Sequence, residues 1–120
     1  MKKILVVDDE PDVLRVMSFR LKNAGYEILT AANGRIAFDI ISKERPDLVL
    51  LDLRMPVMDG CETCARIKND EGLKEIIVIL ITASSGSKVA ERAKELKADD
   101  YIIKPFDPDE LISKVRKYIG

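Results

Sequence analysis

The stretch DLVLLD, residues 47–52, indicates how this chain folds, because it is a short apolar run that ends in an acid. Four other stretches share this character: KILVVD at 3–8, EILTA at 27–31, IIVILIT at 76–82 and DYIIK at 100–104. Short, continuous apolar runs are typical of parallel strands that are buried on both faces of a sheet. The sequence therefore predicts five parallel strands.

Segments with helical periodicity separate these runs. The first helix is expected at 11–24, because Pro11 suits a first helical position and Gly25 can supply a left-handed stop. Residues that open or cap the later helices are Asn33-Gly34 before 34–44, Asp59 before 60–69, Ser87 before a fourth helix and Asp107 before the last. The last helix is marked most clearly, since Pro108 follows its cap and Glu110 would complete a capping box.

The alternation of strand and helix limits the topology. Five strand-helix repeats predict right-handed crossovers and an α/β, doubly wound sheet with helices on both faces. We expect the flavodoxin-like strand order 2-1-3-4-5. In that order a crevice opens at the carboxyl ends of the first and third strands, and the function is to be sought there.

Composition excludes several classes of function. The 120 residues fit one domain, 1–120, and a hydrophobic content of 47% can fill a single core. Twenty Lys and Arg against 21 Asp and Glu give a net charge of -1, which offers no electrostatic case for direct binding of nucleic acid or an anionic membrane. We also expect a cytoplasmic protein, because Asp8 and Asp9 interrupt the N-terminal apolar run before it could form a signal peptide. No apolar stretch approaches the roughly 20 residues that cross a bilayer. The absence of histidine excludes a Ser-His-Asp triad, a histidine-ligated zinc site and a phosphohistidine carrier.

Chemically distinctive side chains follow four of the expected strands. At the carboxyl ends of these strands stand Asp8 and Asp9 for the first, Asp52 for the third, Thr82 for the fourth and Lys104 for the fifth. Three carboxylates at one sheet edge repel one another, and oxygen ligands favour a hard cation such as Mg2+. With that ion, Asp52 can be both ligand and nucleophile, while Lys104 and Thr82 share the charge of a phosphoryl group in transfer. The product would be an aspartyl phosphate.

Each of these residues also has a simpler interpretation. Asp9 and Glu10 can cap the first helix, Thr82 can be an ordinary strand residue, and Lys104 can be a solvated end. The coincidence of all of them at one sheet edge favours the phosphoryl-transfer site.

Four segments, VVDDEP, LLDLRMPVMDG, LITA and DDYIIKPF, resemble the signature segments of the bacterial two-component response-regulator receiver domains, the CheY-like family. The resemblance covers residues 3–119 and includes the spacing between the segments. It implies a phosphoacceptor domain that catalyses only its own phosphorylation and dephosphorylation. The partners it implies are a sensor histidine kinase, a downstream protein or effector domain and a second, phosphorylated copy of the domain.

The resemblance also assigns roles. Asp8, Asp9, Asp52 and the backbone carbonyl of Arg54 would bind Mg2+, with Asp52 as phosphoacceptor. Thr82 and Lys104 would contact the phosphoryl group, and Thr82 and Tyr101 would form the switch that alters the face made by the fourth helix, fifth strand and fifth helix. The chain departs from the family's pattern, or falls where the family varies, at four positions. Lys97 stands where glycine is common, so the fourth helix is expected either to end less sharply or to carry a strained left-handed residue. Ile77 stands where proline is common, and Arg54 and Ser84 are positions that tune phosphoryl lifetime.

The Lys104-Pro105 bond is expected to be cis. The chain must direct an ammonium group back into the crevice and then turn sharply toward Asp107, and a cis bond before proline costs only about 0.5 to 1 kcal/mol. The resemblance implies the same geometry.

Other readings of the sequence remain. Cys61 and Cys64 form a C-x-x-C motif, but we expect two buried core thiols and no redox pair. An aspartate-nucleophile phosphatase would carry its nucleophile after the first strand in a D-x-D pattern. A small flavodoxin-like binding module would not place Asp8, Asp9 and Glu10 where a phosphate must bind.

Overall fold

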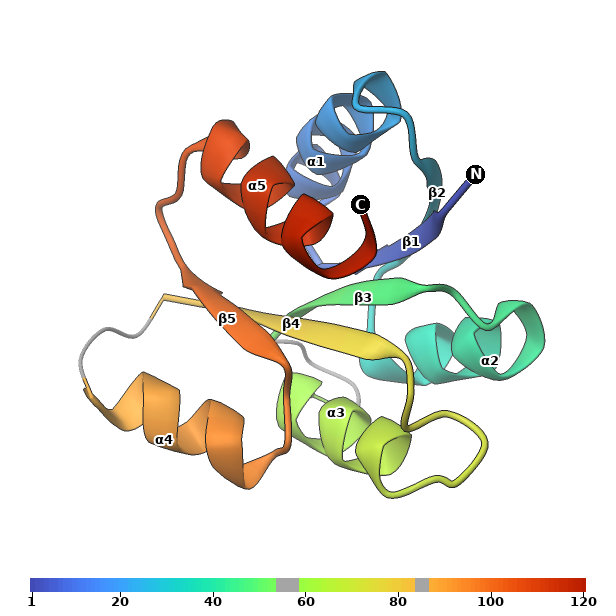
Figure 1. Ribbon diagram of the computed structural model, residues 1–120, viewed down its shortest axis with the longest axis vertical. Helices are drawn as coiled ribbons and strands as arrows, with labels where there is room; N and C mark the ends of the chain where they lie inside the picture. Colours follow the sequence, from blue (N-terminus) through green and yellow to red (C-terminus); the bar gives the residue numbers. More distant parts are fainter. Residues whose placement is uncertain (54–58, 84–86) are drawn as a thin grey trace.

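The structure is a computed structural model that describes residues 1–53, 59–83 and 87–120. Its strands are β1 (Lys3–Val7), β2 (Glu27–Ala31), β3 (Leu48–Asp52), β4 (Ile77–Thr82) and β5 (Asp100–Ile103). Its helices are α1 (Pro11–Asn23), α2 (Gly34–Glu44), α3 (Gly60–Lys68), α4 (Ser87–Glu95) and α5 (Pro108–Ile119). Strand and helix alternate along the whole described chain (Figure 1).

The five strands form one parallel sheet in the order β2-β1-β3-β4-β5, which confirms the predicted topology. Helices α1 and α5 lie on one face of this sheet, and α2, α3 and α4 lie on the other (Figure 1). β3, the central strand, is buried along its entire length. The apolar run that indicated the fold is therefore covered by helices on both sides.

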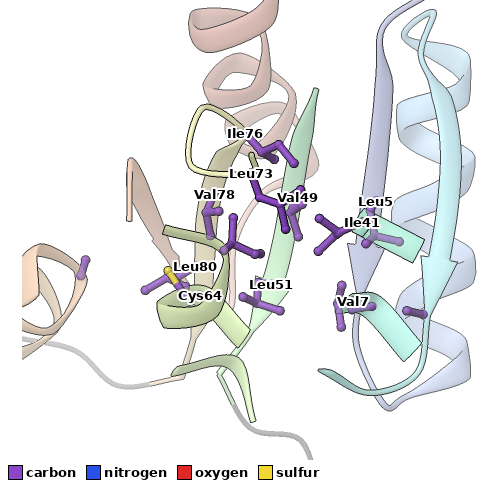
Figure 2. Close-up of a cluster of buried hydrophobic side chains, with 14 residues drawn as sticks. Leu5, Val7, Ile41, Val49, Leu51, Cys64, Leu73, Ile76, Val78 and Leu80 are labelled. Atoms are coloured by element: carbon purple, nitrogen blue, oxygen red, sulfur yellow. The ribbon is translucent and has the colours of Figure 1, made fainter. Parts of the chain in front are cut away.

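Alternation along the strands divides the core into two clusters. On the face of α1 and α5, Leu48 and Leu50 pack with Met17, Leu111 and other apolar residues. On the opposite face, shown in Figure 2, the neighbouring residues of the strands pack with side chains from α2, α3 and α4. Because each strand supplies both clusters, the packing fixes the register of the sheet and the positions of its strand ends.

Several of the predicted caps are present. Asn33 and Asp59 accept hydrogen bonds from the backbone amides of Ile36 and Glu62, as N-caps do. Asp107 caps α5 through the amide of Asp109. The prediction for Ser87 is wrong, because this residue is already helical, whereas an N-cap residue has an extended backbone.

Residues with a left-handed backbone conformation, that is, a positive φ, follow several of the helices. Gly25, after α1, has a φ of 103°, and Lys97, after α4, has a φ of 61°, as the sequence suggested for both. Arg45, which ends α2 with a φ of 46°, was not predicted. Within the described ranges, no helix is long and apolar enough to cross a membrane.

Candidate functional site

The carboxyl ends of four strands bring the predicted site residues to one edge of the sheet. Val7 pairs with Leu51 in the β1–β3 ladder, so Asp8, which directly follows β1, and Asp52, the last residue of β3, are neighbours. Thr82 ends β4 and pairs with Ile103. The site predicted from the strand ends is therefore assembled by the parallel ladder itself.

Burial distinguishes the acids at this edge. Asp8 is 1% exposed and Asp52 is 5% exposed, whereas Asp9 lies at the surface. Thr82 is also buried. Carboxylates are seldom buried without a compensating partner, because removing the charge from water is costly. The two buried acids therefore need positive charge or hydrogen-bond donors close to them.

Lys104 supplies positive charge to both buried acids. Its Nζ lies 2.9 Å from Oδ2 of Asp52 and 3.4 Å from Oδ2 of Asp8. Burial works against the charged ammonium, but the hydrogen bonds and the negative charges of Asp52 and Asp8 outweigh it and raise the pKa of Lys104. The lysine is therefore a fixed cation at this site.

The backbone aims Lys104 into the crevice. The Lys104–Pro105 peptide bond is cis, as predicted, and the amide of Lys104 donates a hydrogen bond of 2.7 Å to the carbonyl oxygen of Thr82. This bond continues the β4–β5 ladder by one residue before the chain turns. The side chain of Lys104 consequently starts at the same sheet edge as Asp52.

Asp8 is the acid whose protonation is most altered. Its pKa is raised to about 6, first by burial and also by a hydrogen bond with the nearby Asp52 and by the charge of that residue. The backbone amide of Glu10, which donates to Oδ1 of Asp8 at 2.9 Å, and the charge of Lys104 act in the opposite direction. The single positive charge of Lys104 therefore does not fully neutralise the negative charges of Asp8 and Asp52.

The acids after β1 fit a divalent cation. Carboxylate oxygens of Asp8, Asp9 and Glu10 lie within 4.8 Å of one another. An all-oxygen donor set with uncompensated negative charge suits a hard cation such as Mg2+. From the sequence, Glu10 is expected only to cap the first helix or to repel a phosphate, although three consecutive acids after a strand also indicate a larger oxygen cluster.

Two predicted residues lie apart from this cluster or outside the description. Tyr101 is half-buried in β5, and its ring lies 5.7 Å from Nζ of Lys114 on α5. Arg54, the predicted carbonyl ligand, falls outside the described residues, as does Ser84.

The two cysteines behave differently from each other. Cys64 is buried beside Leu51 and Leu80 (Figure 2), and burial raises the pKa of its thiol to about 11. Cys61 is only half-buried, so the expectation of two core thiols is wrong for this residue. Because α3 turns by about 100° per residue, positions 61 and 64 lie about 60° apart around the helix, and Cys61 falls at the edge of the buried stripe. A buried thiol with a raised pKa is a poor nucleophile, which is consistent with a packing role for Cys64.

Comparison with known proteins agrees with this geometry. The family model described as response regulator receiver domain matches residues 4–116. The chain is 43% identical to the sporulation initiation phosphotransferase F of Bacillus subtilis over 119 residues, covering 98% of this chain and 94% of that protein. Its fold is similar to the chemotaxis protein CheY4 of Vibrio cholerae, with a TM-score of 0.92, 31% identity and 98% of each chain covered.

Longer relatives are also similar. The probable transcriptional regulator ycf27 of Cyanophora paradoxa is 43% identical over 120 residues, which cover 98% of this chain and 48% of that protein. The chain thus spans about half the length of the ycf27 relatives that it matches. These similarities give no support to the phosphatase or to the flavodoxin-like alternative.

Proposed function

Because the chain belongs to the response regulator receiver family, which serves phosphorelay signalling, we propose that Asp52 is its phosphoacceptor and that Mg2+ is its cofactor. The observation that carries the proposal is the placement of Asp52. It is a buried carboxylate at the end of the central strand, 2.9 Å from an ammonium group and next to a cluster of acids.

Asp8 and Asp9 would hold the Mg2+ ion together with Asp52 and the backbone carbonyl of Arg54, as the sequence predicts, and we extend the proposed ligand set to Glu10. When bound, the ion supplies charge neutralisation and orientation for phosphoryl oxygens. An oxygen of Asp52 attacks phosphorus, a new P–O bond forms, and the bond from phosphorus to the donor breaks. Lys104 balances the charge on the transferred group, and the hydroxyl of Thr82 contacts one of its oxygens.

Receiver domains take phosphoryl groups from histidine kinases and act on effectors. We propose that this chain does both as one unit, residues 1–120, and that its only catalysis is its own phosphorylation and dephosphorylation. The downstream partner would be an effector or a second copy of the domain that recognises α4, β5 and α5. The charge balance of the chain supports neither direct binding of nucleic acid nor binding to a membrane.

A labelling experiment tests the acceptor. Acetyl phosphate with Mg2+ should add one phosphoryl group, seen by intact-mass measurement, with acetate as the leaving group. Asp52→Asn should abolish the labelling, while Asp39→Asn, which changes an exposed acid on α2, should leave it unchanged. Excess EDTA should stop the reaction, because the acids would then repel the anionic donor. Equal labelling of the Asp52→Asn variant would refute the proposal.

A further inference from the structure

Gly60, the first residue of α3, packs directly against the end of β3. A Cβ atom built on this residue would lie 2.7 Å from the Cα of Leu53 and closer still to the carbonyl oxygen of Asp52. Real Cβ atoms do not approach backbone atoms this closely. Any side chain at position 60 would therefore displace the backbone of the proposed phosphoacceptor.

Space, and not backbone conformation, requires the glycine. Gly60 lies within a regular helix, in which other residues adopt the same backbone angles without strain. Among the described residues, positive φ values occur at two other glycines, Gly25 and Gly120, and at Arg45 and Lys97. A glycine is therefore needed at position 60 because a side chain would collide with the backbone of Asp52 and Leu53.

The start of α3 is held in place, so it cannot simply move away. Asp59 accepts a hydrogen bond of 2.9 Å from the amide of Glu62, and its carbonyl oxygen accepts another from the hydroxyl of Thr63. Cys64 and Ile67 are fully buried in the core on this face of the sheet. A side chain at position 60 would meet an anchored helix on one side and the end of β3 on the other.

The end of β3 holds Asp52, and phosphoryl transfer depends on the position of this residue. The amide of Leu53 donates to the carbonyl oxygen of Ile81, and the carboxylate of Asp52 contacts Lys104 at 2.9 Å. A displacement of about 1 Å in a reacting group can reduce a rate by about 100-fold. Small shifts of this strand end are therefore expected to matter for chemistry before they matter for folding.

We infer that Gly60 is a positioning residue for phosphoryl transfer: the absence of a side chain there sets the place of the Asp52 carboxylate relative to Lys104 and Asp8. The inference rests on the proposed function and deepens it. It concerns a residue that packs against the backbone of the acceptor segment and takes no part in the reaction itself.

The test compares Gly60→Ala with two control variants, using phosphoramidate as donor and Mg2+ at saturation. Gly72→Ala adds the same methyl group where a Cβ would meet only side-chain atoms, of Asp70 at 3.3 Å and Arg45 at 3.8 Å. Ile67→Val removes a methyl group from the buried face of α3 and lowers stability without adding any atom beside Asp52 or Leu53. The rate of mass gain is measured against donor concentration, and urea unfolding is measured for all three variants.

Gly60→Ala should lower the saturated rate by about 10-fold or more and change the half-saturating donor concentration by less than about 3-fold. The carboxyl carbon resonance of Asp52 and the ammonium resonance of Lys104 should shift in this variant. Gly72→Ala should react like the wild type, and Ile67→Val should show that a loss of stability alone does not slow transfer. A saturated rate within about 2-fold of wild type in Gly60→Ala would overturn the inference.

Two further outcomes are decisive. If Gly60→Ala is unstable, the assay is repeated in the cold with trimethylamine oxide, which favours the compact state. A variant that stays unfolded even then would assign Gly60 to folding and contradict a positioning role. Absence of labelling at Asp52 in the wild type would instead remove the proposed function itself, so the two failures are distinguishable.

Discussion

The ammonium nitrogen of Lys104 lies 2.9 Å from Oδ2 of Asp52, although the two residues are 52 positions apart in the chain. The same nitrogen reaches Oδ2 of Asp8 at 3.4 Å. Lys104 therefore bridges the carboxyl ends of β1 and β3 from the end of β5. A cation held in this way compensates the buried acids and stands where the oxygens of a transferred phosphoryl group would need positive charge.

Replacing this cation should affect transfer strongly. Lys104→Met should lower the rate of labelling by acetyl phosphate by about 100-fold or more, because one fixed charge no longer stabilises the transition state. Intact-mass measurement over time gives the rate. Lys94→Met, a change at an exposed residue of α4, is the matched control and should react normally. Rapid labelling of the Lys104 variant would assign the lysine a structural role only.

Much of this arrangement was predictable from the sequence. All five strands lie within one residue of the expected ranges, because apolar runs buried on both faces leave little freedom in register. Asp8, Asp52, Thr82 and Lys104 were found by reading the residues that follow the runs. Parallel strands bring their carboxyl ends to one edge, so a list of strand ends already approximates the site.

Other features depend on contacts that no local pattern encodes. The left-handed Arg45 at the end of α2 occupies a position where glycine is the usual signal. Its guanidinium group donates to the carbonyl oxygen of Gly72, 27 positions away. The close approach of Gly60 to Asp52 is likewise a property of how α3 packs on β3. Such features follow from the tertiary structure and could not be read from periodicity.

The raised pKa of Asp8 predicts a pH dependence in the metal-free protein. Burial raises this pKa from 3.8 to about 6, so the folded state binds the proton more tightly than the unfolded chain does. The resulting stability is fully present below about pH 4 and is lost as the pH rises through about 6. The loss is on the order of 3 kcal/mol.

Urea unfolding in EDTA between pH 4.5 and 7.5 measures this effect. Asp8→Asn should remove most of the wild type's loss of stability over that range. Added Mg2+ should stabilise the wild type increasingly as the pH rises from 5 to 7, since the ion competes with the proton for Asp8. An identical pH dependence in wild type and Asp8→Asn would contradict the assignment.

The ion pair between Lys68, whose side chain is largely buried, and the partly exposed Asp99 predicts a purely structural effect. Nζ of Lys68 donates to Oδ2 of Asp99 at 2.8 Å and to the carbonyl oxygens of Ile76 and Lys74 at 2.7 and 3.1 Å, and the lysine side chain is 8% exposed. Lys68→Met should lower the free energy of unfolding by roughly 1 to 3 kcal/mol, because three acceptors, one of them partly buried, lose a charged donor.

The matched control for this change is Lys74→Met. Lys74 is 44% exposed and pairs with the solvated Glu71, so its loss should cost less than about 0.5 kcal/mol. Urea titration gives both values. Similar costs for the two variants would mean that the Lys68 pair is as weak as a surface pair.

The last prediction concerns Tyr101 and Lys114, on the face of the domain that we propose to change on phosphorylation. Nζ of Lys114 lies 2.9 Å from Oδ1 of Asp100 and 5.7 Å from the centre of the Tyr101 ring. The positive charge therefore stabilises the ring in its present, half-buried position. If phosphorylation draws Thr82 toward the phosphoryl group and turns Tyr101 inward, that attraction opposes the change.

Lys114→Gln should consequently favour the activated state, because the amide can still donate to Asp100 but carries no charge. We expect beryllofluoride, a stable mimic of the phosphoryl group, to bind this variant about 2 to 5 times more tightly, which corresponds to a loss of about 0.5 to 1 kcal/mol of cation–π attraction. Amide chemical shifts measured during the titration should change across α4, β5 and α5.

Lys117→Gln is the matched control, because Lys117 lies on the same helix and faces the ring of Tyr118 at 5.4 Å, and it should bind like the wild type. Unchanged or weaker binding by Lys114→Gln would show that the charge does not oppose the switch, and shift changes confined to the surroundings of Asp52 would show that no switch reaches this face.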